Sequence, residues 1–277
     1  MNSTSDTNQF YAHTRKDAAK SEWQKLIVHL NQTAQLAADM GRDAGIAELA
    51  RIAGQIHDLG KYSQAFQRRL DGSKKSVDHA TAGAQEIWKL FGQSNKWQAL
   101  ILAYAIAGHH GGLPDYGSLS DIKGDGTLLI RLNPEKVKLE DYSAFKNEID
   151  LSVLTLPALT FKRTQTPGFS CSFLARMLFS ALVDADWLDT ERFCDEGAKP
   201  RGGYDSIEIL CRRLNGYLHR FDHPTTPINQ KRTETLAACR QKADSPQGIF
   251  TLTIPTGGGK TLASMAFALN HAARHNL

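Results

Sequence analysis

The sequence predicts an all-α bundle over residues 1–220, followed by the first edge of an α/β nucleotide-binding domain. Apolar residues recur at helical spacing in successive segments of the first part. After residue 247 the pattern changes to a β-rich run, a glycine-rich turn and a further apolar helix, which is the order of a phosphate-binding loop. Residues 221–228 contain two prolines and two threonines and are expected to form a linker, so residues 229–277 begin the second domain.

Each helix of the bundle is predicted by its apolar face. Trp23, Leu26 and Leu30 mark the first helix, and a long apolar run marks residues 170–188. Residues 114–166 lack this periodicity and are expected to form an irregular insertion with one or two short helices, one near 140–148. The expected helices are, in chain order, 17–39, 43–58, 79–91, 97–107, 170–188, 207–217 and 229–242, with a last one after the glycine-rich turn.

Composition is that of a soluble globular protein, with 41% apolar and 22% charged residues. The net charge of +4 is compatible with a phosphate-bearing partner but does not require one. The four cysteines are widely spaced and form no CxxC pair, which fits reduced thiols in the cytoplasm. No signal core is found, and no apolar run approaches about 18 residues, so we expect a cytoplasmic monomer without a membrane span.

A histidine–aspartate pair, His57-Asp58, ends the helix predicted at 43–58, and Gly60 and Lys61 follow it. Glycine is typical of helix C-termini, so an imidazole and a carboxylate are expected side by side at a helix end. One metal ion can take both groups, or two ions can share the carboxylate. Taken alone the pair is weak evidence, because this dipeptide is common.

Further candidate ligands strengthen the pair. Tandem histidines flanked by glycines end the helix predicted at 97–107. Asp184 and Asp186 lie at i and i+2 on a helix and cannot both face one centre, so one of them is the expected ligand. Imidazoles combined with carboxylates favour Fe, Mn, Ni, Co or Zn. The candidate ligands are His29, His57, Asp58, His79, His109, His110 and one of the two aspartates.

Seven candidate ligands exceed what one tetrahedral ion needs, so two ions are expected. Two ions about 3.5–4 Å apart, bridged by Asp58 and a hydroxide, would stabilise the attacking and leaving oxygens of a phosphodiester. The bridging water would be the nucleophile, and Lys61 would neutralise phosphate charge. His57, Asp58 and Lys61 are therefore the expected catalytic residues.

The glycine-rich turn carries a second expectation. Backbone N–H groups of the turn and the following helix N-terminus would hold phosphates, Lys260 would reach the β- and γ-phosphates, and Thr261 would hold Mg²⁺. Ile254 stands where the general template has glycine, and the form P-T-G-G-G-K-T is similar to that of superfamily 2 helicases. No acidic second strand follows before Leu277, so we expect a motor domain cut short, with Mg-ATP used only by the full-length helicase. The predicted nucleotide-binding residues are Gly257, Gly258, Gly259, Lys260 and Thr261.

The order of these motifs resembles a known family. His57-Asp58 with the surrounding histidines and Ala185-Asp186-Trp187 is similar to the HD phosphohydrolase superfamily. An HD domain followed by P-T-G-G-G-K-T resembles the nuclease part of the type I CRISPR-associated helicase–nucleases. The residues around the loop, 252–254 and 267–272, are similar to those of subtype I-C members. The resemblance covers the whole chain but only the first edge of the helicase, and residues 114–166 match nothing informative.

The resemblance implies an all-α HD domain that uses two transition-metal ions to cut single-stranded DNA. In the family the substrate is the strand displaced by an RNA-guided, Cascade-type effector complex, and helicase lobes driven by ATP deliver it. The first metal is implied at His29, His57, Asp58 and Asp186, and the second at Asp58, His79, His109 and His110. Asp186 is preferred over Asp184 because it is the first aspartate of an Ala-Asp-x-x-Asp pattern.

Three other interpretations remain open from the sequence. An HD phosphohydrolase could act on nucleotides or cyclic dinucleotides, although such enzymes need no DNA motor. A non-catalytic metal-binding module could dock a helicase onto a partner, which loss of a ligand would favour. A bundle with histidines in its core would need several well-placed histidines to be coincidental.

Overall fold

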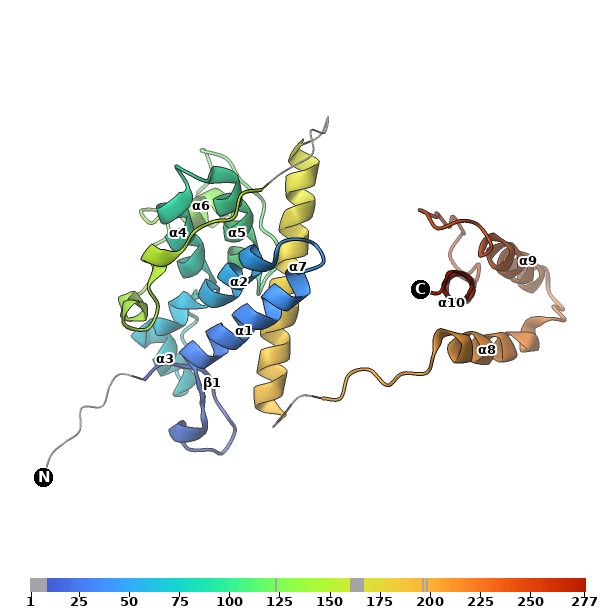
Figure 1. Cartoon of the computed structure of the whole chain (residues 1–277), viewed down its shortest axis with the longest axis horizontal. Coiled ribbons are helices and arrows are strands. Elements are labelled where there is room, and N and C mark those ends of the chain that lie inside the picture. The colour runs from blue at the N-terminus through green and yellow to red at the C-terminus, as the bar shows by residue number, and fades with distance from the viewer. Residues whose placement is uncertain (1–8, 123, 160–166, 196, 198) are drawn as a thin grey trace, which may run out of the picture. The chain divides into compact units, whose positions relative to one another are not determined.

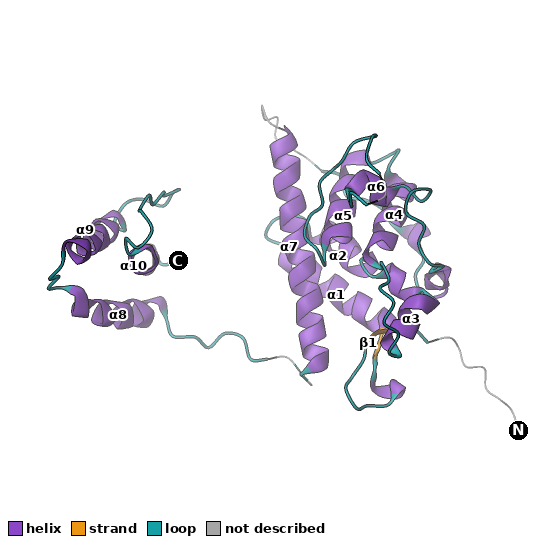
Figure 2. Ribbon diagram, turned by 180° about the vertical axis from the view of Figure 1, so that it is seen from behind, coloured by secondary structure: helices purple, strands orange, loops and turns teal. Residues whose placement is uncertain are grey.

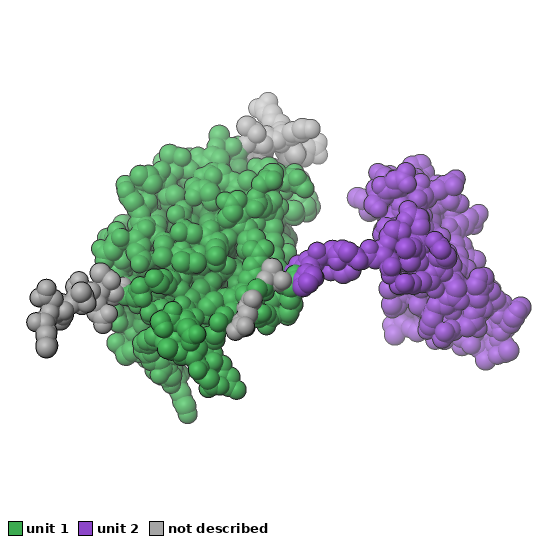
Figure 3. Space-filling view, turned by 60° about the horizontal axis from the view of Figure 1, so that its bottom comes forward, with its two compact units in different colours: residues 1–199 green, residues 200–277 purple. Residues whose placement is uncertain are grey.

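The computed structural model describes residues 9–122, 124–159, 167–195, 197 and 199–277. The chain forms two compact units, residues 1–199 and 200–277, coloured green and purple in Figure 3. Unit 1 holds every predicted metal ligand, and unit 2 holds the glycine-rich loop. Helices dominate the described residues of both units, and the sheet found among them is a two-stranded hairpin (Figure 2), which confirms the expected all-α bundle.

Unit 1 is a helical bundle in which α7 runs along α1 and α5 (Figure 1). Helix α2 packs against α1, and α4 packs against α5. The core between these helices includes Leu30, Ile52, Ile106 and Leu178, all without exposed surface. The helices are α1 (Leu26–Gly41), α2 (Ala47–Ile56), α3 (Gln64–Leu70), α4 (Ala80–Phe91), α5 (Lys96–Gly108), α6 (Leu128–Leu132) and α7 (Pro167–Cys194).

A glycine on α2 brings the end of that helix close to α1. A Cβ atom at Gly54 would lie 2.6 Å from the Cα of Ala34 and 2.7 Å from its backbone nitrogen, so only glycine fits at this crossing. The close crossing draws His57, one residue beyond α2, toward His29 on α1. Local sequence thus sets the distance between two predicted ligands.

The first helix begins later than the sequence predicted. Residues expected in helix 17–39 instead contribute to the hairpin of β1 (Tyr11–His13) and β2 (Gln24–Lys25), and α1 starts at Leu26. The Trp23 ring packs edge-on against Tyr11, with centroids 5.7 Å apart. The predicted helix start is wrong because the pairing of residues 24–25 with residues 11–13 outweighs the helical spacing of apolar residues.

The insertion carries short helical pieces, as expected. Helix α6 and the 3-10 turns η3 (Ser143–Asn147) and η4 (Leu151–Val153) lie between α5 and α7, and η3 confirms the short helix expected near 140–148. Phe145 is 2% exposed and joins the core of unit 1. The last part of the insertion, residues 160–166, lies outside the described residues.

Unit 2 contains α8 (Ile207–Leu218), α9 (Pro227–Lys242) and α10 (Lys260–His275), with α10 packed against both others. Helix α8 therefore belongs to this unit, whereas the sequence placed the boundary at residue 220. The β-rich run 248–254 forms no strand in the described structure, contrary to expectation. A strand needs a neighbour to take its backbone hydrogen bonds, and the described residues of unit 2 present none.

One helix of the described chain, residues 168–194, is long and apolar enough to cross a membrane by length and composition alone. From the sequence, no membrane-spanning segment is expected, because no apolar run approaches about 18 residues. In unit 1 this helix packs against α1 and α5 and carries Asp186 and Asp189. Core helices of soluble proteins meet the same criterion.

Candidate metal centre

The seven predicted ligands come from several elements of unit 1 and from the turns beside them. His29 lies on α1 and Asp186 on α7. His57 and Asp58 stand between α2 and the 3-10 turn η2 (Leu59–Tyr62), where the helix ends. His79 immediately precedes α4, and His109-His110 directly follow α5.

The first group surrounds one oxygen of Asp58. Its Oδ2 atom lies 3.5 Å from His29 Nε2 and 3.3 Å from His57 Nε2. Asp186 Oδ1 lies 3.3 Å from His29 Nε2 and 3.7 Å from His57 Nε2. The four donor atoms all lie within 4.8 Å of one another, a spacing that a single cation could serve.

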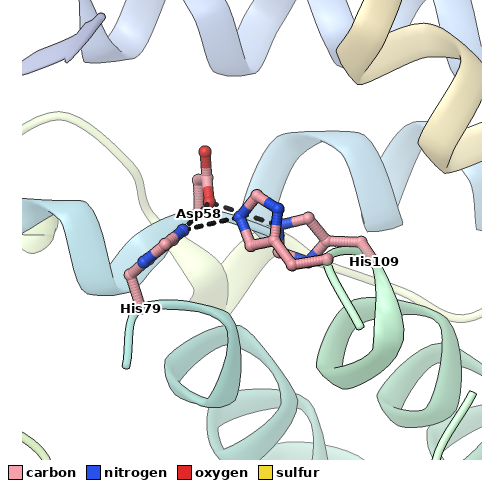
Figure 4. Close-up of side chains that lie close together, drawn as sticks. Asp58, His79 and His109 are labelled. Atoms are coloured by element: carbon pink, nitrogen blue, oxygen red, sulfur yellow. Dashed lines mark hydrogen bonds and ion pairs between the residues drawn. The ribbon is translucent and has the colours of Figure 1, made fainter. Parts of the chain in front are cut away.

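The second group surrounds the other oxygen of Asp58. Oδ1 lies 3.6 Å from His79 Nε2 and 3.5 Å from His109 Nε2, as Figure 4 shows. His110 Nε2 is 2.7 Å from His79 Nε2 and completes the group. Because each oxygen of Asp58 faces a different group, this carboxylate is placed to bridge two cations.

Several candidate metal-ligand atoms of these two groups are buried and have no hydrogen-bond partner among the described residues. His29 Nε2, His57 Nε2, His109 Nε2 and Asp58 Oδ1 have no hydrogen-bond partner there. Leaving such atoms unsatisfied costs free energy, typically about 1–3 kcal/mol each. Imidazole nitrogens and carboxylate oxygens converging in this way fit a divalent transition metal.

The other ring nitrogen of each buried histidine is held by the protein. His57 Nδ1 donates to the carbonyl of Gly54 at 2.8 Å, and His109 Nδ1 donates to that of Ile106 at 2.7 Å. His29 Nδ1 donates to Asp189 Oδ2 at 2.6 Å. These acceptors keep the proton on Nδ1, so Nε2 is the nitrogen that is aimed at the centre and that would bind a metal.

A close glycine contact positions the second group. A Cβ atom at Gly60 would lie 2.5 Å from the backbone Cα and carbonyl oxygen of His79. The turn that follows Asp58 can therefore approach His79 only with glycine at this position. The glycine of the motif thus has a role beyond ending the helix.

Burial and charge set the ionisation of the first group. Burial lowers the pKa of His29, but the nearby carboxylates of Asp186, Asp189 and Asp58 outweigh it and raise that pKa to about 9. Burial likewise opposes the charged form of His57, but Asp58 and Asp186 raise its pKa to about 10. Burial would raise the pKa of Asp58, but Lys61 and His57 hold it well below the usual value.

The second group differs because two of its histidines, His79 and His110, favour the neutral form. Burial is the main cause that lowers the pKa of His79, and burial together with the charge of His109 lowers that of His110 to about 4. At neutral pH these imidazoles are unprotonated and ready to bind. The two groups therefore start from different protonation states.

We expect metal binding at the first group to release protons. At pH 7 the metal-free protein holds protons on His29 and His57, whose pKa values of about 9 and 10 lie above the solution pH. A cation must displace them, so its affinity rises as pH rises from 7 toward 9. Isothermal titration calorimetry in buffers of different ionisation enthalpy measures the number of protons released per bound cation. Release of about two protons is expected, and no buffer dependence at pH 7 would contradict this assignment.

Asp186, and not Asp184, faces the first group. The Asp186 side chain is 13% exposed, whereas Asp184 is exposed on the opposite side of α7. Trp187, the next residue on α7, is 72% exposed. The reason is helical geometry, because a residue adjacent to a ligand on a helix points about 100° away from it.

Sequence reasoning missed three residues behind the first group: Asp189, Gln24 and His13. Asp189 follows Asp186 by three positions, so the shared helix face was a usable signal. Its carboxylate is 2% exposed and accepts from His29 and from Gln24 Nε2, the latter at 2.7 Å. Gln24 and His13 lie on the hairpin, and no local pattern points to them.

Lys61 is buried beside the carboxylate that the two groups share. Its Nζ atom lies 2.7 Å from Asp58 Oδ2, and its side chain is 5% exposed. Contacts with the carbonyl of Ala12 at 3.4 Å and with His13 Nε2 at 3.5 Å complete its surroundings. The ammonium therefore offsets the charge of Asp58 from within the protein.

The predicted nucleotide-binding residues gather in unit 2. Gly257 and Gly259 adopt positive φ angles of 82° and 86°, and α10 starts at Lys260. Lys260 and Thr261 line a cavity of about 660 Å³ together with Arg232. Arg232 also donates to the carbonyl of Gly257 at 2.8 Å and thereby ties α9 to the loop.

A helical bundle with a His-Asp pair at a helix end and histidines on either side of the aspartate defines an HD-type metal-dependent hydrolase. A family model described as "Cas3, HD domain" matches residues 12–189, and the chain belongs to this family. No curated protein sequence matches the chain. Residues 12–189 are accordingly a metal-dependent nuclease domain of CRISPR systems, and the histidine–aspartate cluster fits its divalent metal site.

Proposed function

We propose that unit 1 hydrolyses phosphodiester bonds of single-stranded DNA with two divalent metal ions. The observation that carries this proposal is Asp58, whose two oxygens face two separate groups of ligand atoms. The proposed ligands are His29, His57, Asp58 and Asp186 for one ion and Asp58, His79, His109 and His110 for the other.

The exposure of the two groups favours one direction of approach for the substrate. His29, His57 and Asp58 are fully buried. His110 is exposed, and the His79 side chain is 15% exposed. A phosphate would therefore enter from the side of the second group.

Bound ions would supply Lewis acidity and an activated water for attack on phosphorus. The residues of the chain prepare the site for this chemistry. Asp58 stays ionised at neutral pH because Lys61 and His57 hold its pKa down. The buried Lys61 ammonium adds positive charge beside Asp58 Oδ2, next to the first ligand group.

The family match supports a proposal about the wider setting of the reaction. We propose that the chain is part of a subtype I-C helicase–nuclease whose motor lobes deliver a strand displaced by a Cascade-type RNA-guided complex. Mn, Ni, Co or Fe would be the working metals, in keeping with the mixed imidazole and carboxylate donors. The protein would act as a cytoplasmic monomer outside that complex.

Cleavage of circular single-stranded DNA tests this function, because a circle has no ends and reports endonuclease activity. The chain is incubated with EDTA, Mg²⁺, Mn²⁺, Ni²⁺ or Co²⁺ and without ATP. Linear products with a transition metal and none with EDTA are expected. Hydrolysis of dNTPs or cyclic dinucleotides with an intact circle would instead assign a small-molecule phosphohydrolase, and metal binding without any hydrolysis would favour a docking module.

Unit 2 supports a second proposal, the binding of a nucleoside triphosphate. The cavity beside Lys260 has the volume of a ligand site, and Gly257 and Gly259, both at positive φ, line it without side chains. We expect Lys260→Ala to weaken ATP binding at least about tenfold, because the phosphates lose their charged partner. Fluorescent ATP-analogue titration measures this, with Lys231→Ala, an exposed lysine of α9, as the control. Equal affinity in both variants would contradict the proposal.

A further inference from the structure

The β1–β2 hairpin lies directly behind the first ligand group. His13 and Gln24 are register partners across the two strands. The Gln67 side chain ties the hairpin to the bundle: it accepts from Tyr11 N at 3.1 Å and donates to Tyr11 O at 3.0 Å and to Lys61 O at 2.8 Å. The hairpin is therefore fixed to the turn that carries Lys61.

A chain of hydrogen bonds runs through this hairpin from Lys61 to Asp189. Lys61 Nζ lies 3.5 Å from His13 Nε2, at the long end of hydrogen bonding. His13 Nδ1 lies 2.7 Å from Gln24 Oε1. Gln24 Nε2 then donates to Asp189 Oδ2 at 2.7 Å, and Asp189 accepts from His29.

The charges at the two ends fix the direction of every bond in the chain. A carboxylate only accepts, so Gln24 must present its NH₂ group to Asp189 and its oxygen to His13. His13 must then carry its proton on Nδ1 and leave the Nε2 lone pair facing Lys61, whose ammonium only donates. Burial and the neighbouring Lys61 charge lower the pKa of His13 to about 4, in agreement with this neutral form.

The chain also closes on the metal centre at both ends. Lys61 contacts Asp58 Oδ2 at 2.7 Å, and Asp189 holds His29, whose Nε2 faces the same oxygen of Asp58 at 3.5 Å. The rings of His13 and His29 further pack edge-on, with centroids 4.9 Å apart. A change in the hairpin therefore reaches two groups around the first metal position.

We propose that Gln24 and His13 are positioning residues of the metal centre, which hold Asp189 against His29 and Lys61 against Asp58 and thereby set the affinity of the first ligand group for a divalent cation. The inference rests on metal binding and is independent of whether DNA is the substrate. Gln24 is the more informative of the two to vary, because it is 6% exposed and its amide links a carboxylate to an imidazole.

The test measures Co²⁺ affinity and the visible absorption of bound Co²⁺ in the whole chain carrying His110→Ala, which leaves the first group complete. Gln24→Glu removes the amide donor and sets a second carboxylate beside Asp189. A loss of Co²⁺ affinity of about 10–100-fold and an altered Co²⁺ spectrum are expected. Lys25→Glu adds a carboxylate at the exposed neighbouring position of β2 and should change the affinity less than about twofold.

A second variant keeps the test decisive where Gln24→Glu alone prevents folding. Gln24→Met has a similar length but neither donates to Asp189 nor accepts from His13, and it adds no charge. It should weaken Co²⁺ binding about tenfold and alter the Co²⁺ spectrum, although His29 keeps its own hydrogen bond with Asp189. A Co²⁺ affinity within about twofold of the parent in whichever of the two Gln24 variants folds would overturn the proposal.

Discussion

Asp58→Asn is expected to abolish DNA cleavage, with a loss of more than about 10³-fold. The substitution preserves the size of the side chain but removes the charge that both ligand groups share. In either orientation of the amide, its NH₂ group would face the histidine nitrogens of one of the two ligand groups. One ion would lose its ligand and the other would keep only a neutral amide oxygen, so the loss should exceed that from any ligand of one group alone. Initial rates on circular single-stranded DNA with Mn²⁺ measure the effect.

Asp184→Asn is the matched control for that variant. Asp184 is an exposed aspartate on the helix that carries Asp186, and it lies outside both groups. Its cleavage rate should stay within about twofold of the parent rate. Substantial activity in Asp58→Asn, or equal losses in the two variants, would refute the bridging role of Asp58.

Lys61→Met is expected to lower the free energy of unfolding of the metal-free protein by about 3 kcal/mol. Removing one partner of a buried ion pair leaves the other charge uncompensated, which typically costs about 3–5 kcal/mol. The lower end applies because His57 and His29 also lie beside Asp58. Added Mn²⁺ should narrow the difference, because cations at the site would take over the compensation of Asp58. Thermal unfolding with EDTA and with Mn²⁺ measures both parts.

Lys20→Met provides the comparison for a surface lysine. Lys20 pairs with Asp71 at 2.6 Å, but the side chains are 54% and 44% exposed, so the pair contributes at most about 1 kcal/mol. Its variant should unfold close to the parent temperature with or without metal. If Lys61→Met behaved like Lys20→Met in EDTA, Lys61 would not be the charge partner of Asp58.

The ligands could be predicted because local sequence marks them. His57-Asp58 and His109-His110 are adjacent pairs at helix ends, and the fold confirms the helices that end there. The structure brings these four residues together with His29, His79 and Asp186, as the resemblance implied. Their assignment as ligands remains a prediction until metal is seen at them.

The supporting residues could not be predicted, because long-range pairing places them. Gln24 lies inside the helix predicted at 17–39, and only pairing with residues 11–13 puts it in a strand. Its partner Asp189 lies 165 residues away along the chain. The strand predicted at 248–254 was wrong because a β-rich segment forms no sheet without a neighbouring strand, and the described residues of unit 2 supply none.

Anomalous diffraction from crystals grown with Mn²⁺ tests the central claim most directly. The account predicts two peaks separated by about 3.5–4 Å, with one oxygen of Asp58 on each. His29, His57 and Asp186 should surround one peak, and His79, His109 and His110 the other. A single peak, or peaks that do not contact Asp58, would contradict the shared carboxylate on which the proposed nuclease depends.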